Sequence, residues 1–459
     1  MGSKIKMFET KRVDFMFWAI TAIGILFLSF ASMPILSPIL IVLLGVVFGL
    51  LIIATFASED FNFLVNIFLI GVTLRIFLSY LFYSTSFLVK SVYLSPGFLF
   101  VNDGFCYSQQ GWQICQFAER GIKVTAETFM NDPNMRVWGS SGNITFYDFF
   151  ASHVYSITGY SPLSLFFISS IAGSISGLFI YLIAKELFSK NVARISAGFA
   201  FFWPSFIMWS TQNLKEPMVA MFTFIFLWAI FYMSKHLHAV FIFLCLACLW
   251  TLFMISFPLF IIIVFAICLS VLFLFTSHFL QNKGVAIIVI GILGVLAFIF
   301  LKDSAISFIA KKSNYDISSY NSILDFFQYH RSVRAHGSLQ FLKEINISNP
   351  VKAIFYAPLG LLYAIFAPFP WQLGSVMQIM AVPETIVFYA LFPCTVKGVI
   401  FAYKKRFAQS ILILSIILAM LSFLALVEGN SGTLFRHRAI VFYLILMFTA
   451  AGMTLKNEN

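Results

Sequence analysis

Charged residues are scarce in this chain of 459 residues. Asp, Glu, Lys and Arg together make up 10% of it, 61% is hydrophobic, and the mean hydropathy is +0.94. A soluble domain carries roughly 25% charged residues, so the composition excludes a water-soluble protein and predicts a polytopic membrane protein. The apolar runs are long and do not alternate with polar residues, which predicts an all-α bundle of spanning helices rather than a membrane barrel.

Cysteine is scarce too, and so are patterns that bind metal. Of six cysteines, those in apolar runs are expected to be packing residues, namely Cys245, Cys248, Cys268 and Cys394. Cys106 and Cys115 lie in a polar segment, where the sequence is consistent with a disulfide and equally with two free thiols. No pair of His, Asp or Glu has a dependable metal spacing, so neither a metal site nor another cofactor is predicted.

Acidic residues are outnumbered by Lys and Arg, 18 to 29, which gives a net charge of +11. Much of the positive charge lies in short loops and termini, where it sets orientation and contacts lipid headgroups. No basic tail with interleaved aromatics is present, so nucleic acid is not an expected partner. An internal repeat is also missing, and with it the inverted-repeat signature of many transporters.

The apolar runs predict about 12 to 14 transmembrane helices in a single integral membrane domain, residues 1–459. Basic residues at 4–12 place the N-terminus in the cytoplasm. Spans are expected at about 14–33, 35–56, 62–84, 163–184, 192–210, 217–234, 285–301, 353–367, 385–403, 408–427 and 439–455, with two more between 239 and 276. One further crossing or re-entrant piece within 366–383 would put the basic residues 404–406 in the cytoplasm.

Two long polar segments lie between the spans on the predicted outer side. Residues 85–161 form the first outer loop, with short interfacial helices expected at about 104–121 and 144–159. Residues 302–350 form the second outer loop. Long loops in a compact membrane protein are usually functional, so the outer side is where a site is expected.

Unusual polar side chains are predicted to converge on this outer face. Outside residues 428–438 they are Asp103, Tyr107, Lys215, Glu216, Arg331, Arg334, His336, Trp371, Gln372 and Glu384. Simpler interpretations exist for several of them. Asp103 with Gly104 fits a turn, the pair at 215–216 fits a helix start or a surface ion pair, and the basic group at 331–336 fits a solvated face. Arg75, at membrane depth, is a further functional candidate that snorkelling also explains.

Residues 428–438 are the densest polar segment between two apolar spans. They include Glu428, Asn430, Arg436, His437 and Arg438 together with two glycines. Forked arginine donors and a closely approaching glycine backbone suit a phosphate or pyrophosphate, whereas an ordinary polar turn with snorkelling arginines is the alternative. The predicted substrate-binding set contains these five side chains and also Tyr107, Lys215, Glu216, Arg331, Arg334, Trp371 and Gln372.

Four stretches resemble the C-type (GT-C) glycosyltransferases. The first is Asp103 with Tyr107 and Gly111, and the others are residues 147–159, residues 203–217 and residues 428–438. This superfamily includes protein O-mannosyltransferases and aminoarabinose transferases, and it uses sugars linked to polyprenyl phosphate. The chain departs from many members at Gly104, where a second acid is common, so metal dependence does not follow from the resemblance.

The resemblance implies a GT-C-like bundle that moves a sugar from a polyprenyl-phosphate donor to a hydroxyl group of a glycan, lipid or protein acceptor. Asp103 would be the catalytic general base, and Lys215, Arg436 and Arg438 would stabilise the leaving phosphate. Direct displacement would invert the anomeric carbon. The composition fits a bacterial cytoplasmic (inner) membrane, with the active face periplasmic or extracellular and a role in cell-envelope glycan synthesis.

Two other functions fit the residues. An O-antigen-type polymerase or ligase is also polytopic with basic outer loops, but it needs no acid in the first loop. A transporter or flippase for a lipid-linked sugar needs charged groups at mid-membrane, where the sequence offers Arg75 and Lys397.

Overall fold

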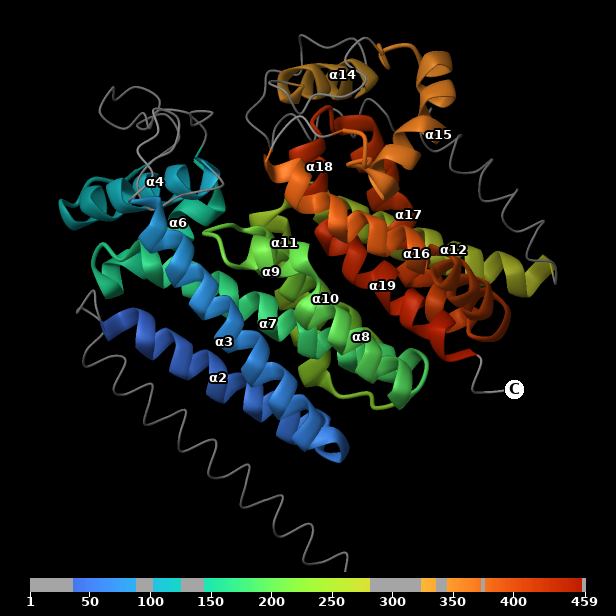
Figure 1. Cartoon of the computed structure of the whole chain (residues 1–459), viewed down its shortest axis with the longest axis horizontal. Coiled ribbons are helices and arrows are strands. Elements are labelled where there is room, and N and C mark those ends of the chain that lie inside the picture. The colour runs from blue at the N-terminus through green and yellow to red at the C-terminus, as the bar shows by residue number, and fades with distance from the viewer. Residues whose placement is uncertain are drawn as a thin grey trace, which may run out of the picture. The chain divides into compact units, whose positions relative to one another are not determined.

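The structure is a computed structural model that describes residues 36–87, 102–124, 144–280, 323–335, 345–372 and 376–455. The regular elements in these ranges are helices (Figure 1), which confirms the predicted all-α class. The chain divides into two compact units, a first unit of Met1–Phe257 and a second unit of Pro258–Asn459. That the whole chain acts as a single domain stays a prediction.

Seven helices in the described ranges are long and apolar enough to cross a membrane, and two bent helix pairs raise that number to nine. α11 (Ala239–Ile255) and α15 (Pro350–Phe366) are apolar but shorter. The length and composition of this set are those of an integral membrane protein. The predicted spans at 14–33 and 285–301 lie outside the described residues, so the count of 12 to 14 stays a prediction.

The first unit is built around α7 (Pro162–Leu187), whose most apolar stretch is 94% buried. In contact with it lie α2 (Leu36–Phe56), α3 (Phe61–Ser86), α8 (Lys190–Phe202), α9 (Pro204–Ser210) and α10 (Glu216–Met233). A Cβ atom added at Gly173 would lie 2.4 Å from Ser210 Cβ, and one added at Gly177 would lie 2.9 Å from the ring of Phe201. Such small residues let helices approach closely where lipid supplies no hydrophobic driving force.

A short turn, η1 (Ser58–Asp60), joins α2 to α3. The buried Asp60 carboxylate accepts a hydrogen bond from Tyr181 Oη at 2.7 Å and pairs with Lys190 at 2.7 Å and with Arg194 at 2.6 Å. These contacts connect the start of α3 to α7 and α8. Lys190 and Arg194 lie at the start of α8, so these ion pairs are at the turn that follows α7.

The chain bends by 52° between α8 and α9, at Pro204. Proline has no N–H group, so the carbonyl oxygen of Ala200, four residues earlier, loses its helical donor. In a membrane such an oxygen needs another partner, because no water is there to supply one.

Arg75 of α3 supplies that partner. Its guanidinium donates to the carbonyl oxygens of Ala200 (3.2 Å) and Phe201 (3.0 Å) and to Ser210 Oγ (2.9 Å). The side chain is fully buried, so it does not snorkel. Its hydrogen bonds to the carbonyl oxygens at the bend explain why an arginine is buried within this apolar helix.

We expect Arg75→Met to lower the free energy of unfolding by about 2 kcal/mol or more, because it leaves two buried carbonyl oxygens without this donor. The melting temperature in detergent measures the effect. Arg120→Met, the same change at an exposed arginine just after α4, is the matched control. Equal melting temperatures for the two variants would contradict a structural role for Arg75.

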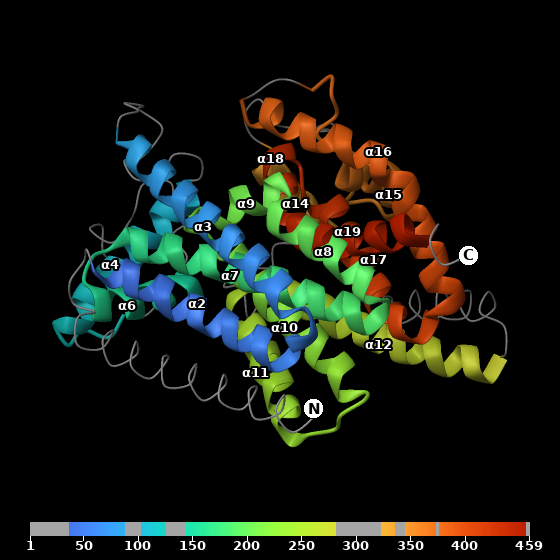
Figure 2. The same cartoon turned by 60° about the horizontal axis from the view of Figure 1, so that its bottom comes forward.

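α12 (Phe257–Leu280) begins at the last residue of the first unit and continues into the second. The other described helices of the second unit pack mainly in pairs. They are α14 (Ile323–Arg334), α15, α16 (Val376–Lys405), α17 (Phe407–Val427), α18 (Ser431–His437) and α19 (Ala439–Thr454). α16 lies along α19, and α17 lies against α14, α15 and α19 (Figure 2). Gly398 of α16 and Gly452 of α19 bring the backbones of these two helices into direct contact: a Cβ atom at either would lie 1.9 Å from a carbonyl oxygen of the other helix.

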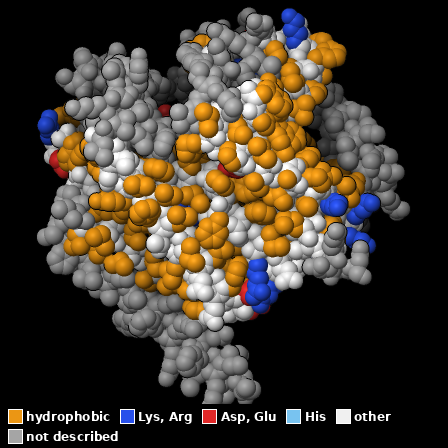
Figure 3. Space-filling view, in the orientation of Figure 1, with side chains coloured by type: hydrophobic (Ala, Val, Ile, Leu, Met, Phe, Trp, Pro, Cys, Tyr) orange, Lys and Arg blue, Asp and Glu red, His pale blue; other side chains and the backbone are white. Residues whose placement is uncertain are grey.

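Among the coloured side chains in Figure 3, hydrophobic ones predominate, and Lys and Arg occur at a few places near the edges. In α11, Val240, Phe243 and Trp250 are exposed, as are Ile354 and Phe355 in α15. Large exposed apolar side chains are expected on helices whose solvent is lipid.

Candidate functional site

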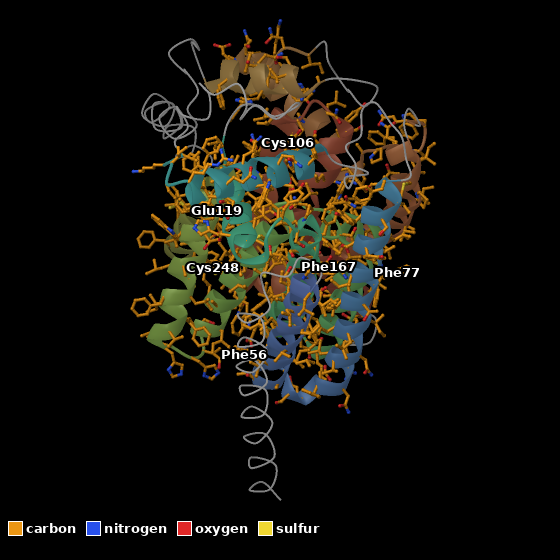
Figure 4. All side chains as sticks on the ribbon, turned by 90° about the vertical axis from the view of Figure 1, so that its left-hand side faces the viewer. Phe56, Phe77, Cys106, Glu119, Phe167 and Cys248 are labelled. Atoms are coloured by element: carbon orange, nitrogen blue, oxygen red, sulfur yellow. The ribbon has the colours of Figure 1, made fainter. Side chains whose placement is uncertain are left out.

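Two helices, α4 (Asn102–Glu119) and α6 (Phe146–Thr158), lie against each other in the first unit. In Figure 4, Cys106 and Glu119 mark α4 at one end of the unit, and Phe56 marks the other end. The bounds predicted for the two short helices of the first outer loop agree with α4 and α6 to within two residues at each end. Their location at a membrane interface stays a prediction.

The predicted catalytic residue, Asp103, lies in the first turn of α4 and is partly exposed. A carboxylate is favoured there by the helix dipole. One turn later, the ring of Tyr107 meets the ring of Tyr147 edge to face, with centroids 4.9 Å apart. A Cβ atom at Gly111 would lie 2.6 Å from Ala151 Cβ, so glycine is needed for this contact between α4 and α6.

Asn213, in the connection between α9 and α10, links the start of α4 to α6. Its Nδ2 donates to the carbonyl oxygen of Gly104 at 2.8 Å, and its Oδ1 accepts from Tyr147 Oη at 3.0 Å. Both contacts are buried. The amide therefore fixes the backbone next to Asp103, a role that the sequence did not reveal.

The connection that carries Asn213 is itself buried over residues 211–214, although it lies between the spans predicted at 192–210 and 217–234 and its composition is polar. Serine hydroxyls from two other helices satisfy its backbone. Ser169 donates to the carbonyl oxygen of Leu214 at 3.2 Å and Ser79 to that of Thr211 at 3.1 Å. A polar composition usually indicates an exposed loop, but here the polar segment is packed against α4 and α6.

We expect Asn213→Ala to loosen the first turn of α4 and to lower any activity that depends on Asp103 by about fivefold, since one buried bond is worth roughly 1 kcal/mol. Amide hydrogen exchange of residues 102–107 should become faster. Gln109→Ala removes an exposed bond from α4 to Tyr160 and is the control. Unchanged exchange in Asn213→Ala would show that the α4 start is fixed by other contacts.

Asp148, at the start of α6, is a second carboxyl in this region and is fully buried. Its Oδ2 accepts from the backbone N–H of Thr145 at 2.6 Å and from the Thr145 hydroxyl at 2.7 Å. Burial raises the pKa of Asp148 to about 6, although the Thr145 bonds and the charge of Lys215 act in the opposite direction. The carboxylate caps α6 as the acidic half of a capping box with Thr145.

Cys106 lies near both carboxyls. Burial raises the pKa of its thiol to about 11, and the charges of Asp103 and Asp148 contribute. Cys106 and Cys115 are both free thiols, so of the two alternatives that the sequence permits, the structure has no disulfide here.

The predicted pair Lys215 and Glu216 lies where α10 begins. Glu216 is in the first turn and is buried, which contradicts a surface ion pair for this residue. Lys215 is partly exposed. Its charge acts on Asp148, so it belongs to the same polar group as the start of α6.

The second unit holds a separate polar group within residues 428–438. Glu428 is fully buried, and its carboxylate contacts Thr433 Oγ1 and His437 Nδ1, each at 2.8 Å. Asn430 caps α18 by accepting from the N–H of Gly432 at 2.8 Å. The Arg436 guanidinium lies 3.4 Å from His437 Nε2.

Arg331 is a correction to the sequence analysis, which favours a solvated face for its group. It is 2% exposed. Its guanidinium donates to the carbonyl oxygen of Glu428 at 2.8 Å and lies 4.7 Å from the ring centroid of Tyr356. Gly429 permits this approach, because a Cβ atom there would lie 2.7 Å from the Arg331 carbonyl oxygen.

Arg438 is buried as well, between α18 and α19. It donates to the carbonyl oxygens of Ala364 (3.3 Å) and Ile365 (3.0 Å), and its guanidinium lies over the rings of Phe435 and Phe442. The snorkelling interpretation is therefore wrong for Arg438, and its described contacts join α15 to the start of α19.

The remaining predicted residues are more dispersed. Trp371 is exposed and stacks on Phe369, with ring centroids 4.9 Å apart. Gln372 donates to Tyr363 Oη at 3.4 Å, and Glu384 is buried. The side chain of Arg334 and the whole of His336 lie outside the described residues.

Asp103 and its neighbours belong to the first unit and the Glu428 group to the second, so their convergence on one face stays a prediction. Within the described ranges, no group of three or more His, Cys, Asp or Glu is arranged to hold a metal ion. The first group contains a partly exposed carboxyl on a helix start that Asn213 holds, and the second contains an arginine and a histidine beside a buried acid.

Residues 145–301 match the family model of dolichyl-phosphate-mannose-protein mannosyltransferase. The resemblance to GT-C glycosyltransferases is confirmed. The matched stretch contains α6, Lys215 and Glu216, whereas Asp103 and residues 428–438 lie outside it. No curated protein matches the sequence.

Among solved structures, the chain is similar to the oligosaccharyltransferase of Archaeoglobus fulgidus in its apo form, with 15% identity and a TM-score of 0.46. The similarity covers 86% of this chain and 50% of that one, so this chain spans half the length of the archaeal protein.

Proposed function

We propose that this protein is a membrane glycosyltransferase that moves a sugar from a polyprenyl-phosphate donor to a hydroxyl group of an acceptor. The observation that carries the proposal is Asp103, a partly exposed carboxylate in the first turn of α4 beside the contacts that Asn213 makes. The family match over residues 145–301 supports the same reaction class.

In the proposed reaction, the acceptor oxygen attacks the anomeric carbon of the sugar while Asp103 takes the proton of that hydroxyl. The bond between the anomeric carbon and the phosphate oxygen breaks, and polyprenyl phosphate leaves with both electrons of that bond. A single displacement of this kind inverts the anomeric centre.

Negative charge builds on the leaving phosphate, so nearby cations lower the barrier. Lys215, in the same unit as Asp103, suits this role as a charged side chain that is only partly buried. Arg331 and Arg438 do not suit it, because each is buried with its guanidinium bonded to backbone carbonyl oxygens.

The proposed setting is the outer face of a bacterial cytoplasmic membrane, in the synthesis of a cell-envelope glycan or glycoconjugate. A glycan, a lipid or a protein can present the acceptor hydroxyl. Exposed apolar side chains on α11 and α15 are consistent with the lipid surroundings that a polyprenyl donor requires.

The experiment that tests the proposal supplies proteoliposomes with radiolabelled sugars on three carriers: polyprenyl monophosphate, polyprenyl diphosphate and nucleotide. We expect covalent transfer to added cell-envelope acceptors from the monophosphate carrier. Transfer from the diphosphate carrier alone would favour the polymerase or ligase. Label that crosses the vesicle membrane without a covalent product would favour the transporter.

A further inference from the structure

Glu428 follows the end of α17 and is fully buried, yet both oxygen atoms of its carboxylate have partners. Oε2 accepts from Thr433 Oγ1, and Oε1 lies 2.8 Å from His437 Nδ1. Both partners are in α18, the short helix that Asn430 caps. A buried carboxylate is tolerated only when it is hydrogen-bonded or paired in this way, so Glu428 and α18 depend on each other.

The contact with Glu428 also fixes the imidazole of His437. An ionised carboxylate oxygen only accepts hydrogen bonds, so Nδ1 must carry the hydrogen atom. Nε2 is therefore the ring nitrogen that can gain or lose a proton. The His437 side chain is 24% exposed, which is enough for a ligand to reach it.

Arg436 provides a second donor beside this nitrogen. Its Nη2 lies 3.4 Å from Nε2 of His437. Arginine only donates, so in this contact Nη2 donates to the unprotonated Nε2 of the ring. An anion that takes the place of this bond meets two adjacent cations once the imidazole gains a proton, and the buried carboxylate of Glu428 compensates the imidazolium. Adjacent charged donors bind the oxygens of an anion through short, strong hydrogen bonds.

The other two arginines near this segment, Arg331 and Arg438, bind backbone carbonyl oxygens instead. Arg331 donates to carbonyl oxygens at the end of α17, and Arg438 donates to those at the end of α15. Their bonds explain why the segment keeps its shape. The donors with a partly exposed side chain at this place are His437 and Arg436.

We propose that His437 and Arg436 bind the phosphate group of a lipid-linked sugar, and that Glu428 is a positioning residue that acts through His437. The choice of a lipid phosphate as the ligand rests on the proposed function. The arrangement of the donors rests on the contacts of the second unit alone. Glu428, predicted to touch substrate, is instead a buried support for the residue that does.

The test measures binding of two probes, a short-chain prenyl phosphate and inorganic phosphate, to the purified full chain in detergent, from the rise of its melting temperature with probe concentration. We expect prenyl phosphate to bind more tightly. His437→Gln should raise its dissociation constant about tenfold, the loss of one charged hydrogen bond. His330→Gln, the same change at another histidine of the second unit, should leave the constant unchanged.

A double-mutant cycle tests whether Glu428 acts through the ring. We expect Glu428→Gln to weaken binding about as much as His437→Gln, and to add nothing when both changes are present. Additive effects would overturn the positioning role. If Glu428→Gln does not fold, His437→Lys replaces it: this cation should keep most of the affinity that His437→Gln loses.

The outcomes separate this inference from the proposed function. Normal affinity in His437→Gln would overturn the inference, whether or not the protein transfers sugar. Equal dissociation constants for both probes would overturn the claim that the phosphate is lipid-linked. Binding that depends on His437, in a protein that transfers from no monophosphate carrier, would support the phosphate site and overturn the proposed function alone.

Discussion

Asp103→Asn is expected to lower the rate of sugar transfer by about 10²- to 10⁴-fold, the usual contribution of a positioned general base. The amide has nearly the same shape as the carboxylate, so the first turn of α4 and its contact with Asn213 should persist. It cannot accept a proton from the acceptor hydroxyl at neutral pH. Initial rates with the radiolabelled monophosphate donor, at equal protein levels, measure the loss, and the KM of the donor should change little.

Two further variants control for a general effect on α4. Glu119→Gln makes the same change at the exposed last residue of the helix and should keep full activity. Asp103→Glu keeps the base but moves it by one methylene, so its rate should lie between those of the wild type and Asp103→Asn. Full activity in Asp103→Asn would remove this residue from the reaction.

Gly398→Ala is expected to lower the stability of the second unit by about 3 kcal/mol or more, the upper part of the range for overpacked sites. The added Cβ would lie 1.9 Å from the carbonyl oxygen of Phe448. A backbone oxygen cannot rotate away as a side chain can, so α16 and α19 would have to separate. Gly452 has the reciprocal contact with the carbonyl oxygen of Cys394.

Gly198→Ala is the matched control for this prediction. Gly198 is also in a helix, α8. Apart from its chain neighbours and the backbone of its own helix, no atom lies within 4 Å of an added Cβ. Alanine is the better helix former, so this variant should be as stable as the wild type or slightly more. A melting temperature for Gly398→Ala equal to that of Gly198→Ala would contradict the backbone contact.

Elements that depend on local pattern could be predicted from the sequence. The long apolar runs predict the long apolar helices of the described ranges, and the bounds predicted for the two short helices of the first outer loop agree with α4 and α6 to within two residues. The sequence predicts two helices between residues 239 and 276, and α11 ends at Ile255 just before α12 begins at Phe257. In each case the signal lies in neighbouring residues, because helix formation and proline breaks are local events.

The buried connection at residues 211–214 could not be predicted in this way. Its composition is that of an exposed loop, and its hydrogen-bond partners Ser79 and Ser169 are 132 and 45 residues distant in sequence. Arg331 is similar, since the carbonyl oxygen that it contacts is 97 residues away. A bond from a side chain to a distant backbone leaves no pattern in a single sequence.

The backbone contact between Gly398 and Gly452 also restricts how the second unit can move. Sliding α19 along α16 by one residue, a rise of about 1.5 Å, would replace each glycine at the contact with a residue that has a Cβ atom. A change of register between α16 and α19 would therefore require the two helices to separate first.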